Sequence, residues 1–191
     1  GDTLYAAMGT MGVGVIDVKD RKAPTFVKRI AVNGTTRDLC SGPRGLMVAA
    51  ETLTWVQRPE DAFPHVGSTG IPTPGAVLGQ GAFLVAVGTT LTKIDAQGYA
   101  SFGGEHVVLE DEIRDLERLP GGVAIAAGSD GLVLLEYDGM KNRLAARVDP
   151  GGACTRVHAR GTLLFATADA YGFAVYDVKN PKDPKKIYPA E

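Results

Sequence analysis

Charged side chains that could bind a ligand recur at similar places along the sequence. They form three short groups, namely Arg37 with Asp38, Arg114 with Asp115, and Arg156 with His158. A guanidinium group presents a planar fork of N–H donors that matches a carboxylate or a phosphate. If the three groups converge in the fold, they predict a site for an anionic or sugar ligand. The alternative is structural, with each arginine paired to a neighbouring aspartate so that adjacent segments are held together.

The aspartates of these groups also suggest a catalytic alternative. Asp38 and Asp115 could serve as general acid and general base of a small glycoside hydrolase or lyase, if their carboxylates face each other about 5–10 Å apart. The rest of the sequence favours binding, because it has no phosphate-binding loop, no Gly-x-Ser-x-Gly nucleophile elbow and no His-Glu-x-x-His zinc pair. We therefore expect a non-catalytic binding or scaffold module with a protein or glycan ligand, and we assign no catalytic residue.

The sequence offers little for a metal ion or a cofactor. Its three histidines are isolated from one another, and its two cysteines, Cys40 and Cys154, are too few for a disulfide framework or a thiolate zinc site. Free cysteine is among the most buried residue types, so both cysteines are expected to pack as small apolar side chains. We therefore expect neither a cofactor nor a bound metal.

An internal repeat determines where the charged groups lie. Five short apolar runs recur at intervals of 43, 37, 40 and 40 residues, measured between Ala6, Ala49, Ala86, Ala126 and Ala166. Each run is too short for a typical helix and fits a strand buried on both faces. A second apolar strand follows each run, and a variable, charged segment typical of a sheet edge comes next. Four copies have a further strand before the run, and the charged groups fall within it.

Four short strands in a unit of about 40 residues, without a helix, are typical of a propeller blade. The predicted fold is therefore all-β, a β-propeller of five blades with three to four antiparallel strands each. A β-sandwich is the alternative, but that fold does not require an internal sequence repeat of this length. Residues 110–119 could form a short helix, although the recurring Arg-Asp-Leu tripeptide favours a strand there. The repeats span about residues 1–34, 35–73, 74–111, 112–151 and 152–191 of a single domain.

Composition narrows the choice of partners. The chain has 191 residues, of which 45% are apolar and 22% charged, as in an ordinary globular domain, and its formal net charge is −2. A chain without basic excess gains little from counterion release, so nucleic acid is not expected as a partner. No apolar run approaches the roughly 20 residues that span a bilayer, so we expect no transmembrane segment.

Two stretches resemble a known repeat. In each, an apolar strand runs into Asp-Val-Lys and then into a proline-containing turn: Gly14-Val15-Ile16-Asp17-Val18-Lys19-Asp20 before Pro24, and Phe173-Ala174-Val175-Tyr176-Asp177-Val178-Lys179-Asn180-Pro181 before Pro184. Both resemble the LVIVD repeat, a bacterial and archaeal propeller repeat, and the three middle copies resemble it less. The resemblance implies a propeller fold and an extracytoplasmic or cell-surface location, and it brings no catalytic motif.

The first repeat is one strand short. It opens directly at the apolar run, without the strand that precedes the run in the other four copies. Five blades would therefore hold 19 strands in place of 20. Lys185–Tyr188 is expected to be an outer strand. Either the propeller closes with a three-stranded first blade or it belongs to a longer propeller. In the second case a partner chain or further residues would supply the missing strand or blades. The start at Gly1, already within a strand pattern, fits a processed protein or an excised segment.

Overall fold

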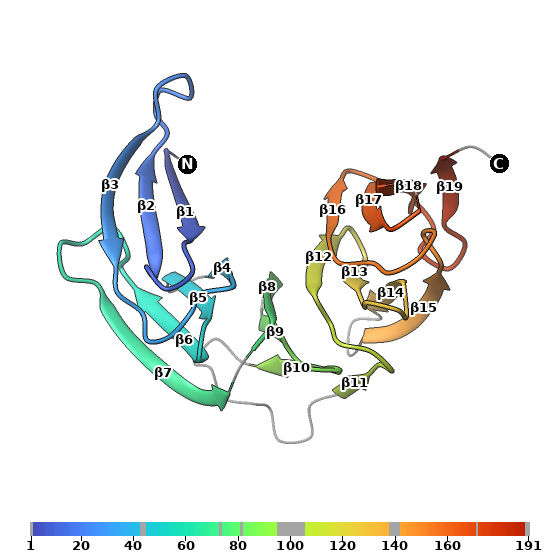
Figure 1. Cartoon of the computed structure of the whole chain (residues 1–191), viewed down its shortest axis with the longest axis horizontal. Coiled ribbons are helices and arrows are strands. Elements are labelled where there is room, and N and C mark those ends of the chain that lie inside the picture. Colours follow the sequence, from blue (N-terminus) through green and yellow to red (C-terminus); the bar gives the residue numbers. More distant parts are fainter. Residues whose placement is uncertain are drawn as a thin grey trace. The chain divides into compact units, whose positions relative to one another are not determined.

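The computed structural model describes residues 2–42, 45–72, 74–80, 82–94, 106–137, 142–170 and 172–189. Every regular element in these ranges is a β-strand, and together they form five sheets (Figure 1). This confirms the predicted all-β class and the number of blades. In the described part of the chain, no helix is long and apolar enough to cross a membrane.

The first two sheets follow one another along the chain. The first is three-stranded, with the order β1 (Thr3–Ala7), β2 (Val13–Asp17), β3 (Thr25–Ile30). The second is four-stranded, with the order β4 (Asp38–Gly42), β5 (Gly45–Ala49), β6 (Thr52–Gln57), β7 (His65–Pro72). The strand missing from the first sheet is its inner one, as the sequence pattern predicts.

The remaining three sheets each have four strands. The third contains β8 (Ala76–Gln80), β9 (Ala82–Val87), β10 (Thr90–Ile94) and β11 (His106–Val108). The fourth contains β12 (Asp115–Leu119), β13 (Gly122–Ala126), β14 (Leu132–Tyr137) and β15 (Asn142–Val148). The fifth contains β16 (Val157–Arg160), β17 (Leu163–Ala168), β18 (Gly172–Asp177) and β19 (Lys185–Tyr188).

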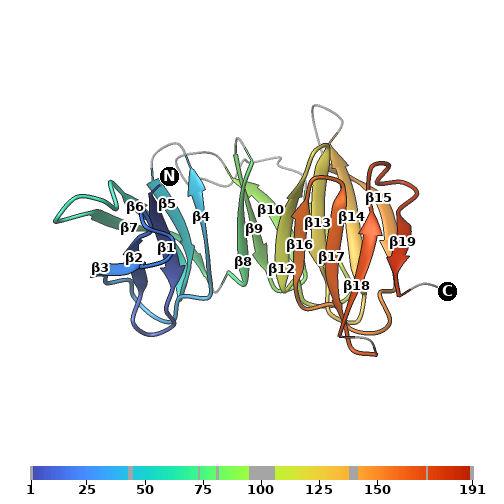
Figure 2. The same ribbon diagram turned by 90° about the horizontal axis from the view of Figure 1, so that it is seen from above.

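Two apolar cores are each shared by a pair of adjoining sheets. The chain divides into two compact units, residues 1–85 with 93–102 and residues 86–92 with 103–191. In the first unit, Val13 and Val15 of the first sheet pack with Leu46 and Val48 of the second. In the second unit the fourth and fifth sheets lie against each other, as Figure 2 shows, and their core includes Leu134.

The inner strands begin later than the sequence indicates. β4, β12 and β16 start at Asp38, Asp115 and Val157, so the arginines expected within them each lie one residue earlier. The predicted inner strands therefore extend one residue too far at this end, and each arginine lies directly before its strand. The backbone N–H groups of Arg37 and Arg114 still donate to C=O groups of β5 and β13, each at 2.8 Å. Each of these is the last hydrogen bond between the inner strand and its neighbour. The helix alternative for residues 110–119 is also wrong, because β12 pairs with β13.

Candidate functional site

Asp38 connects two inner strands of the first unit. Its Oδ1 accepts the N–H of Leu39 at 2.8 Å, and its Oδ2 accepts the N–H of Val77, on β8, at 2.9 Å. Val77 is buried, and a buried N–H without a partner costs free energy. The carboxylate therefore supplies the acceptor that this N–H needs and fastens β8 to β4.

Asp115 has the same role in the second unit. Its Oδ1 accepts the N–H of Leu116 at 3.0 Å, and its Oδ2 accepts the N–H of Val157, at the start of β16, at 3.0 Å. Val157 is also buried. The repeated Asp in the Arg-Asp-Leu tripeptide is therefore a clasp between consecutive inner strands, and its oxygens face backbone donors.

The three arginines have different surroundings. The Nη1 of Arg37 donates to the C=O of Ala50 at 3.1 Å, and the Nη2 of Arg114 lies 3.5 Å from the Oε2 of Glu112. Arg156 is exposed, and within the described ranges its guanidinium has neither a hydrogen bond nor an ion pair. The three guanidinium groups therefore do not share one structural role.

His158 pairs with a glutamate from the preceding sheet. Its Nδ1 lies 3.1 Å from the Oε2 of Glu117, and the two side chains are 74% and 25% exposed. Like Asp115, this pair links β12 to β16. Of the predicted site residues, the second unit therefore brings Asp115 and His158 onto two adjoining inner strands, while Arg37 and Asp38 lie in the first unit.

A pair of loops in the second unit holds a clasp that the sequence did not reveal. Asp111 Oδ2 accepts the N–H of Ser129 at 2.7 Å and its hydroxyl at 2.8 Å. In return, Asp130 Oδ2 accepts the N–H groups of Glu110 and Asp111, at 2.7 and 3.3 Å. The only sequence signal was the Gly-Ser-Asp-Gly turn at residues 128–131, since Asp and Gly favour turns.

Acid should loosen this loop clasp. Hydrogen bonds from Ser129 and Glu112 lower the pKa of Asp111 to about 2. Because this pKa is depressed on folding, the carboxylate stabilises the folded state above its unfolded pKa, and the contribution is lost as pH falls from about 4 to about 2. Acid unfolding followed by circular dichroism should therefore be less steep in this interval for Asp111→Asn than for the wild type. Acid unfolding that is equally steep in the two proteins would contradict the stabilising role assigned to the Asp111 carboxylate.

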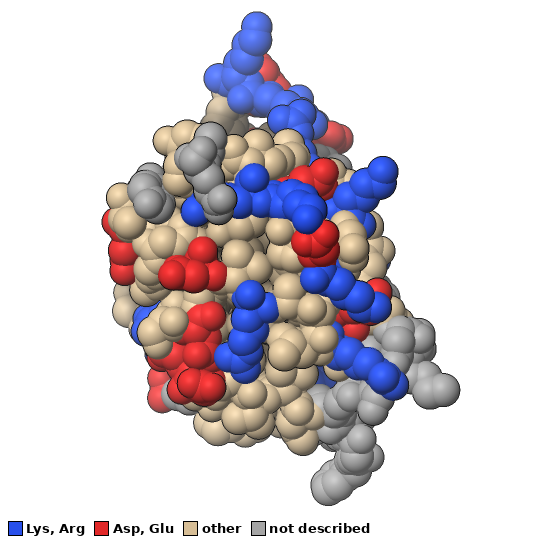
Figure 3. Space-filling model, turned by 90° about the vertical axis from the view of Figure 1, so that its right-hand side faces the viewer, with Lys and Arg blue, Asp and Glu red and all other residues tan. Residues whose placement is uncertain are grey.

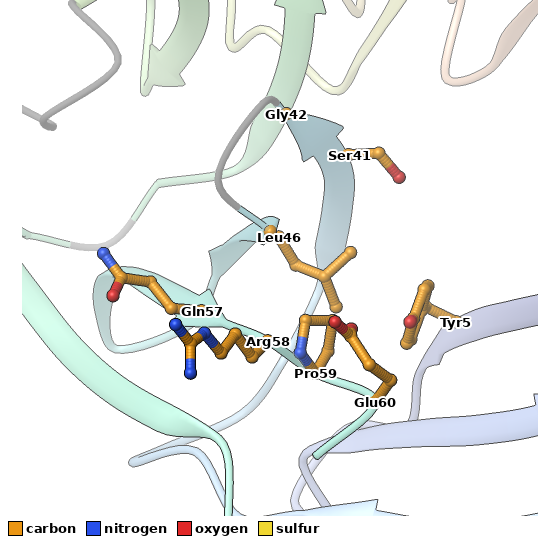
Figure 4. Close-up of a pocket in the computed structure, with 9 residues that line it drawn as sticks. Tyr5, Ser41, Gly42, Leu46, Gln57, Arg58, Pro59 and Glu60 are labelled. Carbon is orange, nitrogen blue, oxygen red and sulfur yellow. The ribbon is translucent and has the colours of Figure 1, made fainter.

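A cavity of about 660 Å³ opens in the first unit. Its wall is formed by Tyr5 of β1, Ser41 and Gly42 at the end of β4, Gly45 and Leu46 at the start of β5, Gln57 at the end of β6, and residues 58–60 that follow it. Figure 4 shows Leu46, Pro59 and Glu60 grouped at its centre, with Tyr5 approaching from the side of β1. Sequence reasoning missed this cavity, because its residues come from separate segments and Tyr5 is part of an ordinary apolar strand.

The cavity wall contains a perturbed phenol and a strained backbone. Burial, together with the negative charge of Glu60, raises the pKa of Tyr5, so its hydroxyl stays protonated and can donate a hydrogen bond. Arg58 has φ 47°, a left-handed conformation that side-chain-bearing residues rarely adopt. Its guanidinium lies 4.0 Å from the carboxylate of Asp61 and is largely exposed.

Neither cysteine forms a disulfide in the described structure. Burial is the main cause that raises the pKa of Cys40 to about 12 and that of Cys154 to about 11. Both thiols are therefore protonated at neutral pH. Cys154 is fully buried, as expected, whereas Cys40 is only partly buried, so the expectation is wrong for Cys40. The described residues also contain no cluster of three or more His, Cys, Asp or Glu side chains that could hold a metal ion.

Charges on the surface are mixed. Figure 3 views the side on which β15 and β19 lie in Figure 1, and shows lysine and arginine side chains interspersed with acidic ones. An ion pair joins Lys182 Nζ to Glu136 Oε2 at 2.8 Å. This side of the molecule therefore combines both signs of charge.

Comparisons with known proteins place the fold. No family model and no curated protein matches the sequence. Among solved structures, a protein of unknown function from Desulfotomaculum acetoxidans DSM 771 is similar, with TM-score 0.75 and 9% identity over 98% of this chain and 65% of that one.

A second structure, from Bacteroides fragilis NCTC 9343, is named as a candidate 6-phosphogluconolactonase. It gives TM-score 0.74 at 11% identity, over 98% of this chain and 67% of that one. This chain thus spans about two thirds of the length of both neighbours. At such low identity the likeness concerns the fold alone, and it shows that this chain has the β-propeller fold that its repeat predicts.

Proposed function

We propose that this chain is a non-catalytic binding module that takes a protein or glycan ligand at the cavity beside Tyr5. The cavity itself is the observation that carries the proposal. Its volume of about 660 Å³ lies within the range typical of ligand sites. Its wall combines an aromatic ring, the apolar Leu46 and Pro59, and the polar Gln57 and Glu60, a mixture that suits a partly polar ligand.

Backbone strain supports the same location. Arg58 directly precedes Pro59, and a proline disfavours helical conformations in the residue before it. A left-handed φ at such a position costs of the order of 1–3 kcal/mol, and strain of this kind clusters at ligand-binding sites. The strained Arg58 adjoins Gln57, Pro59 and Glu60, so its conformation orients this side of the cavity.

The catalytic alternative has less support. A general acid or base needs a carboxylate that is free to exchange a proton with a substrate. Both oxygens of Asp38 accept backbone hydrogen bonds, and so do both oxygens of Asp115. The neighbour named as a candidate 6-phosphogluconolactonase shares only the fold, so we expect this chain not to hydrolyse 6-phosphogluconolactone.

The wider setting of the proposal rests on the repeat. The stretches around Asp17 and Asp177 resemble LVIVD repeats, and we propose that the chain belongs to that family and acts outside the cytoplasm or at the cell surface. The two solved neighbours are longer than this chain, which is compatible with a larger propeller of which these five sheets are a part.

Isothermal titration against a panel of neutral and acidic oligosaccharides and short peptides tests the proposed function. At least one ligand is expected to bind to the wild type. Glu60→Gln changes an exposed side chain and should weaken the affinity for this ligand by about tenfold, because it removes a charge-assisted hydrogen bond. Phe63→Ala is the matched control, because Phe63 is 94% exposed and lies outside the cavity.

Two results would contradict the proposed function. The first is turnover of 6-phosphogluconolactone or of an aryl glycoside that disappears in Asp38→Asn or Asp115→Asn while the fold is retained. The second is a bound ligand whose affinity is unchanged in both Glu60→Gln and Tyr5→Leu, since such a ligand would lie elsewhere on the molecule.

A further inference from the structure

Asn33 and Gly34 form an exposed dipeptide between the first two sheets. They lie after the end of β3 and before the start of β4, outside both strands. Asn33, Gly34 and Thr35 are all exposed, so water reaches the side-chain amide of Asn33. Among the described residues, the Gly34 N–H makes no hydrogen bond. The side-chain amide of Asn33 and the backbone nitrogen that follows it are therefore both accessible for reaction.

The fold requires a glycine directly after Asn33. Gly34 has φ 83°, a left-handed conformation that glycine adopts readily. A Cβ at this position would lie 2.5 Å from the Cβ of Glu51, so the packing also excludes a side chain. Because glycine has no side chain, nothing attached to its Cα shields its backbone nitrogen. The residue type that the packing demands is thus the one that leaves this nitrogen most open.

Thr36 joins the first sheet to the start of the second, close to this dipeptide. It is only 4% exposed. Its Oγ1 accepts the N–H of Met8 at 3.1 Å, and its hydroxyl donates to the C=O of Gly12 at 2.8 Å. The N–H of Thr36 donates to the C=O of Gly9 at 2.9 Å. These bonds hold the loop between β1 and β2 against the residues that lead into β4.

Deamidation is the reaction that an accessible Asn-Gly dipeptide undergoes without an enzyme. The Gly34 nitrogen attacks Cγ of Asn33, so that an N–Cγ bond forms and the Cγ–Nδ2 bond breaks. Nδ2 leaves as ammonia with the proton of the Gly34 N–H, and a succinimide ring remains. Water then opens the ring. Cleavage of the new N–Cγ bond gives aspartate, and cleavage of the original peptide bond gives isoaspartate.

We infer that Asn33 is a site of spontaneous deamidation in the folded chain, and that the isoaspartate formed there loosens the hydrogen bonds of Thr36. In isoaspartate the main chain runs through Cβ and Cγ, so the backbone that leads to Thr36 becomes one atom longer. The modification also adds a negative charge to a dipeptide that packs against Glu51, and like charges repel. This inference goes beyond the proposed binding function and does not depend on it.

Peptide mapping of the full chain during incubation at mildly alkaline pH tests the site. Asn33 should convert to aspartate and isoaspartate at a rate similar to that of a free peptide with the sequence of residues 30–37. Asn180 is the internal control and should stay intact, because the nitrogen of Pro181 carries no proton to lose on ring closure. An Asn33 that persists in the folded chain while the peptide is converted would overturn the inference.

Hydrogen exchange tests the effect on Thr36. In the isoaspartate form, separated by ion-exchange chromatography, the amide of Thr36 should exchange about tenfold faster than in the unmodified chain, as loss of a hydrogen bond implies. The amide of Val157, in the second unit, should exchange at the same rate in both.

Freshly purified Asn33→Asp is the matched control, because it adds the same charge without lengthening the main chain. Its Thr36 amide should exchange as in the wild type. Exchange at Thr36 that is unchanged in the isoaspartate form, or that is accelerated equally in Asn33→Asp, would overturn the inference.

Discussion

Replacement of Leu134 by alanine is expected to lower the free energy of unfolding by about 2–5 kcal/mol, the largest single effect anticipated for this chain. Leu134 lies on β14 and is fully buried, in the cluster that joins the fourth and fifth sheets. Truncation removes buried methyl groups and leaves a space that rigid sheets on either side cannot readily fill. Urea unfolding followed by circular dichroism measures the change.

Leu144→Ala is the matched control. This leucine lies on β15 of the same sheet, but it is 56% exposed. Its truncation should change the free energy of unfolding by less than about 0.5 kcal/mol, as is usual at the surface. Similar losses for the two variants would mean that the face between the fourth and fifth sheets is not the core of this unit.

Replacement of Asp115 by alanine should lower the free energy of unfolding by about 1–3 kcal/mol, because it leaves the buried N–H of Val157 without its acceptor. Asp38→Ala should have a similar effect through Val77. Denaturant midpoints at neutral pH measure both changes, and neither variant should alter affinity for a ligand of the cavity by more than its loss of folded protein explains.

Asp183→Ala serves as the control for the aspartates. Its carboxylate pairs with Lys185 at 2.6 Å, but both side chains are mostly exposed, and such pairs contribute little. A loss of stability in Asp183→Ala as large as that in Asp115→Ala would show that the hydrogen bonds from backbone N–H groups to Asp115 stabilise the fold no more than an exposed ion pair does.

Much of the architecture could be predicted because it depends on local pattern. The apolar runs around Ala49 and Ala126 are strands because strand burial leaves a signature within a few residues. The three-stranded first sheet also followed from counting segments. The first residues of the inner strands were harder to predict. A residue such as Arg114 makes one hydrogen bond to the neighbouring strand but lies just outside its own strand, and amino-acid composition does not show this difference.

The site was harder to predict because its contacts are distant in sequence. The structural alternative for Asp38 and Asp115 foresaw pairing with arginine side chains, and the structure adds backbone donors 39 and 42 residues away. Every residue except proline has a backbone N–H, so no sequence motif could identify these donors. The cavity was missed for a related reason, since Tyr5 and Glu60 meet only when the first two sheets pack together.

Hydrogen exchange at the amides of Val77 and Val157 tests most directly the claim that the recurring aspartates fasten inner strands. In the wild type both amides should exchange slowly. Asp38→Ala should accelerate exchange at Val77 alone, and Asp115→Ala should accelerate it at Val157 alone. Exchange rates at these two amides that are the same in the wild type and both variants would contradict the account.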